Sequence, residues 1–375
     1  MTTEYRICTR CIMDTTDPLI TFDAEGVCSH CRDYEIRAGK ELYSQMDGDE
    51  RLGRLVDEIK EKGKNKKYDC IIGLSGGMDS TMVAYTVKNL GLRPLAIHLD
   101  NEWDADIAVS NIENIIKRLG IEYRAVKTDW EEYKDLQLAF LKASIPNAEI
   151  PTDHAIVAKL YQTAAEEKIR YIISGGNIVT EAIMPFGWGY DAKDLKYIKA
   201  IHKRFGSGIL KTFPKLTLFN WVYYTFVKKI KFIPILNYIR YNKKQATGIL
   251  EKEIQWKHYG AKHFESVYTR FFQSYILPIK FTIDKRKAHF STLINSGQMT
   301  REDAVREMEK DPYPTEKMMR EDRKHVLDKL GISGDEFDAI MKQPVKTFRD
   351  YPNNYFFFYK LRVLVAFAKR IATHN

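Results

Sequence analysis

The stretch that decides the fold is YDCIIGLSGGMDS, residues 68–80. Its first seven residues form a short apolar run typical of a buried strand, and residues 79–90 follow a helical pattern that Gly91 ends. Further along the chain, predicted strands at 93–99, 122–126 and 171–174 alternate with predicted helices at 107–119 and 153–167. Strands that alternate with helices of this length predict an α/β fold with a doubly wound parallel sheet.

The turn between the first strand and its helix predicts a phosphate-binding loop. A turn directly after a parallel strand lies at the carboxyl edge of the sheet, where open α/β sheets bind ligands. Glycines let the backbone approach a polyphosphate, and the helix N-terminus adds free N–H groups and a positive dipole end. A glycine turn alone is common, but the whole string favours ATP. The predicted ATP-binding residues here are Ser75, Gly76, Gly77, Asp79 and Ser80, with Asp79 also expected to hold Mg²⁺ and to act in catalysis.

The loop resembles the SGGxDS signature of the PP-loop ATP pyrophosphatases. This resemblance implies that ATP is cleaved between its α and β phosphates, with an adenylated substrate as intermediate and AMP as product. It also implies that His98 and Asp100, at the end of the second strand, cradle the adenosine. The turn Gly175-Gly176-Asn177 is expected beside the ATP, and Glu181 is a candidate Mg²⁺ ligand. The alternative for Glu181 is a surface carboxylate at the start of a helix.

Four of the five cysteines predict a structural zinc site. Cys8-x-x-Cys11 and Cys28-x-x-Cys31 are separated by 16 residues, which suits four-thiolate tetrahedral coordination. Two such turns close the coordination sphere, so no position stays open for a reacting water. The alternative is a redox-active CxxC pair. It would need a thioredoxin-like βαβ unit beside it, and this part of the sequence does not predict one.

Length and composition indicate an ordinary globular protein in the cytoplasm. The chain has 375 residues and a formal charge of +9, which favours anionic ligands without identifying one. We expect a zinc-binding module at 1–40, a PP-loop ATP-binding domain at 41–200, and a mostly helical substrate- or partner-binding region at 201–375. The longest uncharged run, 216–227, has 12 residues, so no stable membrane insertion is expected. The aromatic and basic segment 210–241 suits buried core, a partner interface or a membrane-surface element.

Polar residues are unusually dense between residues 256 and 306, where cations alternate with aromatic side chains. One charge alone is better explained as a solvated helix face, but the cluster suits a phosphorylated or carboxylated ligand. The predicted substrate-binding residues are Lys262, Glu265, Arg270 and Lys280. Lys285 or Arg286 is expected to stabilise charge on the α-phosphate, and His263 or His289 to act as the base that deprotonates an incoming ammonium ion.

Four blocks of the chain, CTRCIMDTTDP, SGGMDS, GGN with the following TE, and WKHYGAKHFES with DKRKAHFSTLINSGQMTRE, carry a second resemblance. Together they resemble the N-acetyl sugar amidotransferases of bacterial surface-polysaccharide (lipopolysaccharide O-antigen) biosynthesis. The resemblance implies an ATP-dependent conversion of the acetamido group of a nucleotide-linked (UDP) sugar into an acetamidino group. It also implies that a separate glutaminase subunit makes ammonia and that a cyclase-like subunit delivers it. Nucleic acid is not an expected partner.

Two other functions remain open at this point. A tRNA-thiolating enzyme also combines a PP-loop, a zinc module and basic charge, but it needs a persulfide cysteine or an iron–sulfur cluster. Outside the zinc knuckle this chain has only Cys70, which lies in a predicted buried strand. A non-catalytic nucleotide-binding partner is the other alternative, and the intact Ser75, Asp79 and Ser80 argue against it.

Overall fold

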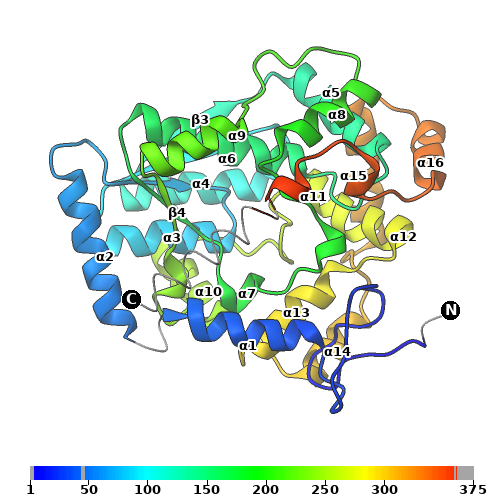
Figure 1. Ribbon diagram of the computed structural model, residues 1–375, viewed down its shortest axis with the longest axis horizontal. Helices are drawn as coiled ribbons and strands as arrows, with labels where there is room; N and C mark the ends of the chain where they lie inside the picture. The colour runs from blue at the N-terminus through cyan, green and yellow to red at the C-terminus, as the bar shows by residue number, and fades with distance from the viewer. Residues whose placement is uncertain (1–3, 44–46, 359, 361–375) are drawn as a thin grey trace.

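The computed structural model describes residues 4–43, 47–358 and 360. Its centre is a five-stranded parallel sheet in the order β3–β2–β1–β4–β5 (Figure 1). The strands are β1 Cys70–Gly73, β2 Pro94–Asp100, β3 Glu122–Lys127, β4 Tyr171–Ser174 and β5 Lys231–Pro234. The prediction of a doubly wound α/β fold is therefore confirmed, with the first four strands within a few residues of their expected positions.

The strand order reverses between β1 and β4. The chain runs from β1 outward through β2 to β3, and then returns to the other side of β1 to form β4 and β5. A reversal of this kind opens a crevice at the carboxyl ends of the two central strands, which is where open α/β sheets bind ligands. The loops after β1 and β4 meet there, since a Cβ atom added to Gly175 would lie 3.3 Å from the Cβ of Asp79.

Helices cover both faces of the sheet. One face is covered by α2 Gly48–Gly63, α3 Met78–Asn89, α4 Asp106–Leu119 and α10 Lys243–Ile254. The other face is covered by α6 Ile150–Glu166, whose Ala158 and Tyr161 pack against buried strand residues. The three central strands β1, β2 and β4 are buried on both sides, which explains their nearly continuous apolar sequences, whereas the edge strands β3 and β5 are partly exposed.

A second, mostly helical body adjoins the carboxyl end of the sheet. It consists of α5 Trp130–Lys142, α7 Ile178–Glu181, α8 Leu195–Phe205, α11 Val267–Phe271, α12 Leu277–Phe281, α13 Lys285–Asn295, α14 Arg301–Met308, α15 Glu316–Leu330 and α16 Gly334–Lys342. A π-helical turn at Phe272–Ile276 joins α11 to α12. Thr300 and Ser333 cap α14 and α16 as their sequence positions predict, and a left-handed Gly331 ends α15. None of the helices in the described ranges is long and apolar enough to cross a bilayer.

The sheet extends further along the chain than we expected. Its fifth strand, β5, lies beyond residue 200, inside the aromatic and basic segment 210–241. The four residues of β5 end in proline and are too few to show the hydrophobic periodicity by which a strand is recognised. The strand forms because β4 has a free edge with which it can pair. The same segment holds α9 Leu218–Val222, which continues as a π-helical turn at Tyr223–Val227.

Candidate active site and zinc centre

The phosphate loop lies at the carboxyl end of β1 and is held from two sides. Gly76 has a left-handed backbone (φ +74°), and an added Cβ there would lie 2.5 Å from the carbonyl oxygen of Ala108. The indole of Trp256 donates a hydrogen bond of 2.9 Å to the carbonyl of Gly76. The next residue, Gly77, is closed in by the carboxylate of Glu265, 3.0 Å from an added Cβ. Only glycine fits the position of Gly76, and a side chain at Gly77 would displace Glu265, so the packing of this loop explains the two glycines of the motif.

The hydroxyls of the loop face a cavity. The Oγ atoms of Ser75 and Ser80 are 3.1 Å apart, and the backbone N–H of Gly77 donates to Ser75 Oγ over 3.2 Å. Both serines line the two adjoining cavities of this region. Hydroxyl and N–H donors gathered at the start of α3 are suited to phosphate oxygens.

Two carboxylates and a lysine converge beside the loop. The ammonium of Lys262 lies 2.6 Å from Glu181 and 3.7 Å from Asp79, and the phenol of Tyr241 donates a hydrogen bond to Asp79. Burial raises the pKa of Asp79. Burial lowers the pKa of Lys262, but Glu181 and Asp79 outweigh it and leave that pKa above its ordinary value. The two acidic residues predicted as Mg²⁺ ligands thus face one point, and their oxygens are the donors that Mg²⁺ prefers.

A basic group lines the same cavity on the other side. The rings of His263 and His289 are 5.7 Å apart between centroids. Burial lowers the pKa of His289 far below its ordinary value, and the neighbouring cations Lys262 and Lys285 add to this. The ammonium of Lys285 is 3.8 Å from Glu149. His289 is therefore neutral and able to accept a hydrogen bond, while Lys285 supplies positive charge.

Two adjoining cavities together form the candidate active site. The larger has a volume of about 1050 Å³ and reaches from the ends of β1 and β2, past His98, to Asp153 and an aromatic wall. The smaller, of about 460 Å³, contains Asp79, the glycines Gly175 and Gly176, and the basic group. They share six residues: Ser75, Ser80, His263, Glu265, Gln273 and Lys285.

Several predicted site residues lie elsewhere or hold structure. Arg270 is buried in an ion pair with Asp322 and does not line either cavity, so the structure does not support its predicted role as a substrate ligand. Lys280 lies outside both cavities as well, and its ammonium binds backbone carbonyls at the end of α16. Asp100 and Asn177 are absent from both cavity walls, and Asn177 caps α7 by accepting the N–H of Thr180. The predicted contacts of these two residues with ATP stay predictions.

His98 and Arg286 line the cavities, but their polar atoms are already engaged. His98 bonds the carbonyl of Leu74 at 2.8 Å and the carboxylate of Asp104 at 2.8 Å. Arg286 pairs with Asp284 and donates to the carbonyl of Lys310 over 2.7 Å. These partners hold each side chain in place, so neither offers an unpaired charge to a ligand. Lys262 and Glu265, by contrast, lie where the sequence placed them, on the cavity wall.

Sequence reasoning missed several residues of the site. Tyr259 lines the smaller cavity, and its Oη accepts the N–H of Met78 at 3.2 Å. The phenol of Tyr241 donates a hydrogen bond to Asp79. Lys243 lines the smaller cavity as well, and burial lowers its pKa. Asp153 faces the larger cavity, where burial and the nearby Glu149 raise its pKa to about 7. No local motif marks these positions, since each reaches the site from a separate element.

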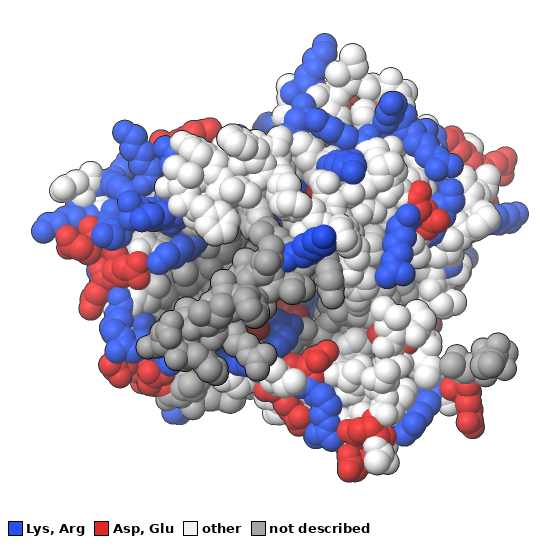
Figure 2. Space-filling model, in the orientation of Figure 1, with Lys and Arg blue, Asp and Glu red and all other residues white. Residues whose placement is uncertain are grey.

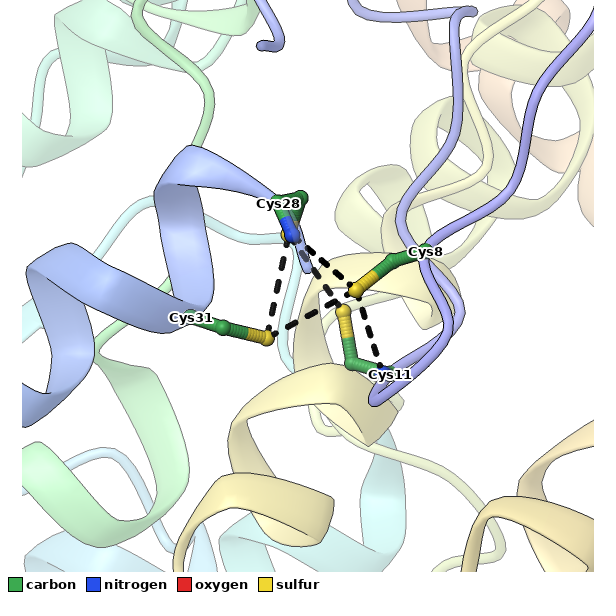
Figure 3. A group of neighbouring side chains, drawn as sticks. All are labelled: Cys8, Cys11, Cys28 and Cys31. Carbon is green, nitrogen blue, oxygen red and sulfur yellow. Dashed lines mark hydrogen bonds between the residues drawn. The ribbon is translucent and has the colours of Figure 1, made fainter. Parts of the chain in front are cut away.

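The four clustered cysteines form a buried group at the N-terminus (Figure 3). The sulfur of Cys8 is 3.9 Å from that of Cys31, and the sulfur of Cys28 is 3.7 Å from those of Cys11 and Cys31. A tetrahedral ion with Zn–S bonds of about 2.3 Å sets its sulfur atoms about 3.8 Å apart. Backbone N–H groups also point at the sulfurs, as at Cys28 N to Cys8 Sγ over 3.2 Å, which favours thiolates. The residues present therefore fit a structural zinc ion.

Two families match the chain. Residues 51–215 match NAD synthase, which agrees with the phosphate loop and the parallel sheet and defines the class as an ATP-utilising PP-loop protein. Residues 265–363 match the family described as LPS biosynthesis protein WbpG-like, C-terminal domain. Together the two matches support a PP-loop protein of lipopolysaccharide biosynthesis, in agreement with the sequence motifs, although neither match spans half of the chain.

Solved structures show related chains at low similarity. The ammonia-dependent NAD synthetase of Campylobacter jejuni is 21% identical over 42% of this chain and 73% of its own, with a TM-score of 0.30. The NMN synthetase of Francisella tularensis is 15% identical over 60% and 92%, with a TM-score of 0.28. The U34-tRNA thiolase NcsA of Methanococcus maripaludis is 19% identical over 65% and 78%, with a TM-score of 0.32. Such scores carry no argument, and no curated protein matches the chain.

Proposed function

We propose that this protein is an ATP-dependent, AMP-forming amidotransferase that acts on an acetamido group of a UDP-linked sugar. The reaction replaces the acetamide oxygen with ammonia to give an acetamidino sugar, and releases AMP and pyrophosphate. The observation that carries the proposal is the joining of two cavities at the phosphate loop, with Ser75 and Ser80 in both walls. Together they exceed the volume that one ligand of drug size needs, which suits a site for two substrates.

The charges of the two cavities support separate roles. The smaller one places the cations Lys243, Lys262 and Lys285 beside the loop together with the carboxylates Asp79 and Glu181, a set that suits the polyphosphate of ATP with its Mg²⁺. The larger one begins at Leu99, at the end of β2, where an adenosine would lie, and extends to aromatic side chains. The reacting atoms would then meet at the shared wall, close to His263 and Lys285.

The chemistry needs ATP because an amide oxygen is a poor leaving group. The acetamide oxygen attacks the α-phosphorus, the bond to the bridging oxygen breaks, and pyrophosphate leaves. Ammonia then adds to the resulting O-adenylated imidate, and AMP leaves with its electron pair to give the amidine. The cations Lys262 and Lys285 would stabilise the negative charge that develops on the phosphates. Mg²⁺ held by Asp79 and Glu181 would add to that stabilisation when bound.

The incoming nitrogen arrives as an ammonium ion that must lose a proton. His263, which lines both cavities, is placed to accept it, whereas the strongly lowered pKa of His289 makes that ring a hydrogen-bond acceptor and a weak base. Asp153 is a further candidate, because it faces the larger cavity with a pKa of about 7 and would attract a cation together with Glu149. We propose that a glutaminase subunit supplies this ammonia through a cyclase-like subunit, since the four clustered cysteines are committed to metal.

The rival function, tRNA thiolation, needs a reactive thiol, and the described part of the chain offers none. Cys70 is fully buried in β1, and burial raises its pKa far above the ordinary value, so it is not a nucleophile. The other cysteines form the zinc centre. A non-catalytic nucleotide sensor needs a cavity for the nucleotide alone and does not account for the second cavity.

The test is direct incubation of the purified protein with ATP, ammonium and a panel of UDP-diacetamido sugars. We expect mass spectrometry to show one sugar losing an oxygen and gaining an NH group, and chromatography to show AMP and pyrophosphate. Glutamine should replace ammonium only after the glutaminase and its docking subunit are added. ADP as the main nucleotide product, or an ATP-dependent sulfur transfer to tRNA, would contradict the proposal.

A further inference from the structure

One helix on the surface is apolar on both of its faces. α9 and its π-helical continuation form one helical stretch, residues 218–227. Trp221 and Tyr224 point inward, where the ring of Tyr224 stacks on Tyr161 of α6 at 5.8 Å between centroids. A surface helix normally places polar residues on the opposite face, and one that is apolar all round is normally buried.

The outward face of this helix is apolar instead. Phe219 is 78% exposed, Phe226 is 57% exposed and Val227 is 64% exposed, and the partly exposed Val222 and Tyr223 lie between them at helical spacing. These five residues, called here the apolar ridge, form a contiguous patch. Figure 2 shows the uncharged surface over α9, with lysine and arginine side chains gathered beside it. Contiguous exposed apolar surface of this kind marks a contact site.

The chain segment that carries the apolar ridge is rich in positive charge. Residues 195–250 contain 12 lysines and arginines and no aspartate or glutamate. Lys228 and Lys229 follow the ridge directly and are exposed, as is Lys211 before it. Lys231 next to them is also exposed, and its ammonium pairs with Glu58 at 3.2 Å.

We propose that the apolar ridge and its lysines dock this protein on the surface of a membrane that contains anionic phospholipids. Exposed aromatic and aliphatic side chains enter the boundary between headgroups and acyl chains, and the lysines bind the headgroup phosphates. A nucleic acid would use the lysines but would leave much of the apolar ridge, including its two valines, in water. A bilayer satisfies both features at once, and the stretch lies in the interface without spanning it.

The experiment is flotation of the purified full-length chain with vesicles made of equal parts phosphatidylglycerol and phosphatidylethanolamine. Vesicles of phosphatidylcholine alone form the neutral arm, and an RNA oligonucleotide forms the nucleic-acid arm. We expect the wild type to float with the anionic vesicles only, and to be released by high salt. Phe219→Ser with Phe226→Ser should weaken partition about tenfold or more. Lys228→Gln and Lys229→Gln should each weaken it about fivefold.

A matched control is Ile279→Ser, which removes an apolar side chain that is 60% exposed on α12. It should float as the wild type does, and thermal melts should show that all variants are folded. The proposal is overturned if the wild type does not float, or if the double phenylalanine variant floats equally well. It is also overturned if the ridge variants break a dimer or lose RNA binding while vesicles have no effect.

Discussion

We expect Arg270 to stabilise the fold rather than to bind a ligand, and its ion pair allows a test. Its guanidinium binds Asp322 through two parallel hydrogen bonds, Nε to Oδ2 over 2.6 Å and Nη2 to Oδ1 over 2.7 Å. The two side chains are only 10% and 7% exposed, so water screens the pair weakly. Arg270→Met removes one partner and leaves the carboxylate of Asp322 with a single hydrogen bond, from Tyr313 over 3.1 Å.

The expected loss of stability is large for one side chain. Breaking a buried pair from one side costs about 3–5 kcal/mol, because the remaining charge stays buried without compensation. Replacing both partners with apolar residues removes that charge, so Arg270→Met with Asp322→Leu should recover most of the loss. The matched control is Arg306→Met, whose partner Asp303 is also acidic but whose side chain is 66% exposed. That change should cost less than about 1 kcal/mol.

Urea unfolding followed by circular dichroism measures these differences, and steady-state kinetics separates scaffold from ligand. We expect the KM values for ATP and for the sugar to stay unchanged in folded Arg270→Met, because the side chain does not reach either cavity. The reasoning is refuted if Arg270→Met is as stable as Arg306→Met. It is refuted equally if the variant keeps its stability and raises the KM for the sugar.

Four further predictions follow from the site and its surroundings. Cys28→Ser should lose the zinc ion and unfold the N-terminal module, and a wild-type protein without zinc by metal analysis would contradict this. Asp79→Ala should fold normally by circular dichroism but form no AMP; unchanged AMP formation would remove Asp79 from the mechanism. Burial lowers the pKa of His154 to about 4, so the free energy of unfolding should fall by about 3 kcal/mol as the pH drops from about 6.5 to about 4; His154→Gln should lose this slope, and equal slopes in urea titrations would refute it. If Asp153 accepts the ammonium proton, the rate at limiting ammonium should rise as the pH passes through about 7, and Asp153→Asn should remove that rise; an unchanged pH profile would exclude this role.

Local signals explain how much of the fold was predictable. The apolar run before Ser75 and the helical period after it are properties of neighbouring residues, and the structure forms its strand and helix there. The cysteine pairs are likewise local, and the four sulfurs meet as the spacing indicates. β5 was missed because a four-residue edge strand is defined by its neighbour in space, not by its own pattern.

The site was harder to predict because the place of each charged side chain depends on a partner that is distant in sequence. Lys262 and Arg270 lie in the same basic stretch, but one meets Glu181 in the cavity and the other meets Asp322 outside it. Nothing within a few residues of either distinguishes the two outcomes. The same holds for Tyr241, which comes to Asp79 from the aromatic and basic segment 210–241, whose pattern left buried core, partner interface and membrane surface open.

The packing of the zinc module explains why an enzyme of this class would keep a metal centre at its N-terminus. The module lies against α13, and the described contacts tie the two together at several points. Asn295 donates to the sulfur of Cys31 over 3.3 Å, Ser291 accepts the N–H of Ile12 over 3.2 Å, and Lys287 pairs with Asp14. The opposite side of the same helix carries Lys285, Arg286 and His289 into the smaller cavity. Because one helix contacts both, we expect that a zinc ion held by the four cysteines would help to fix the position of three cavity residues without touching a substrate.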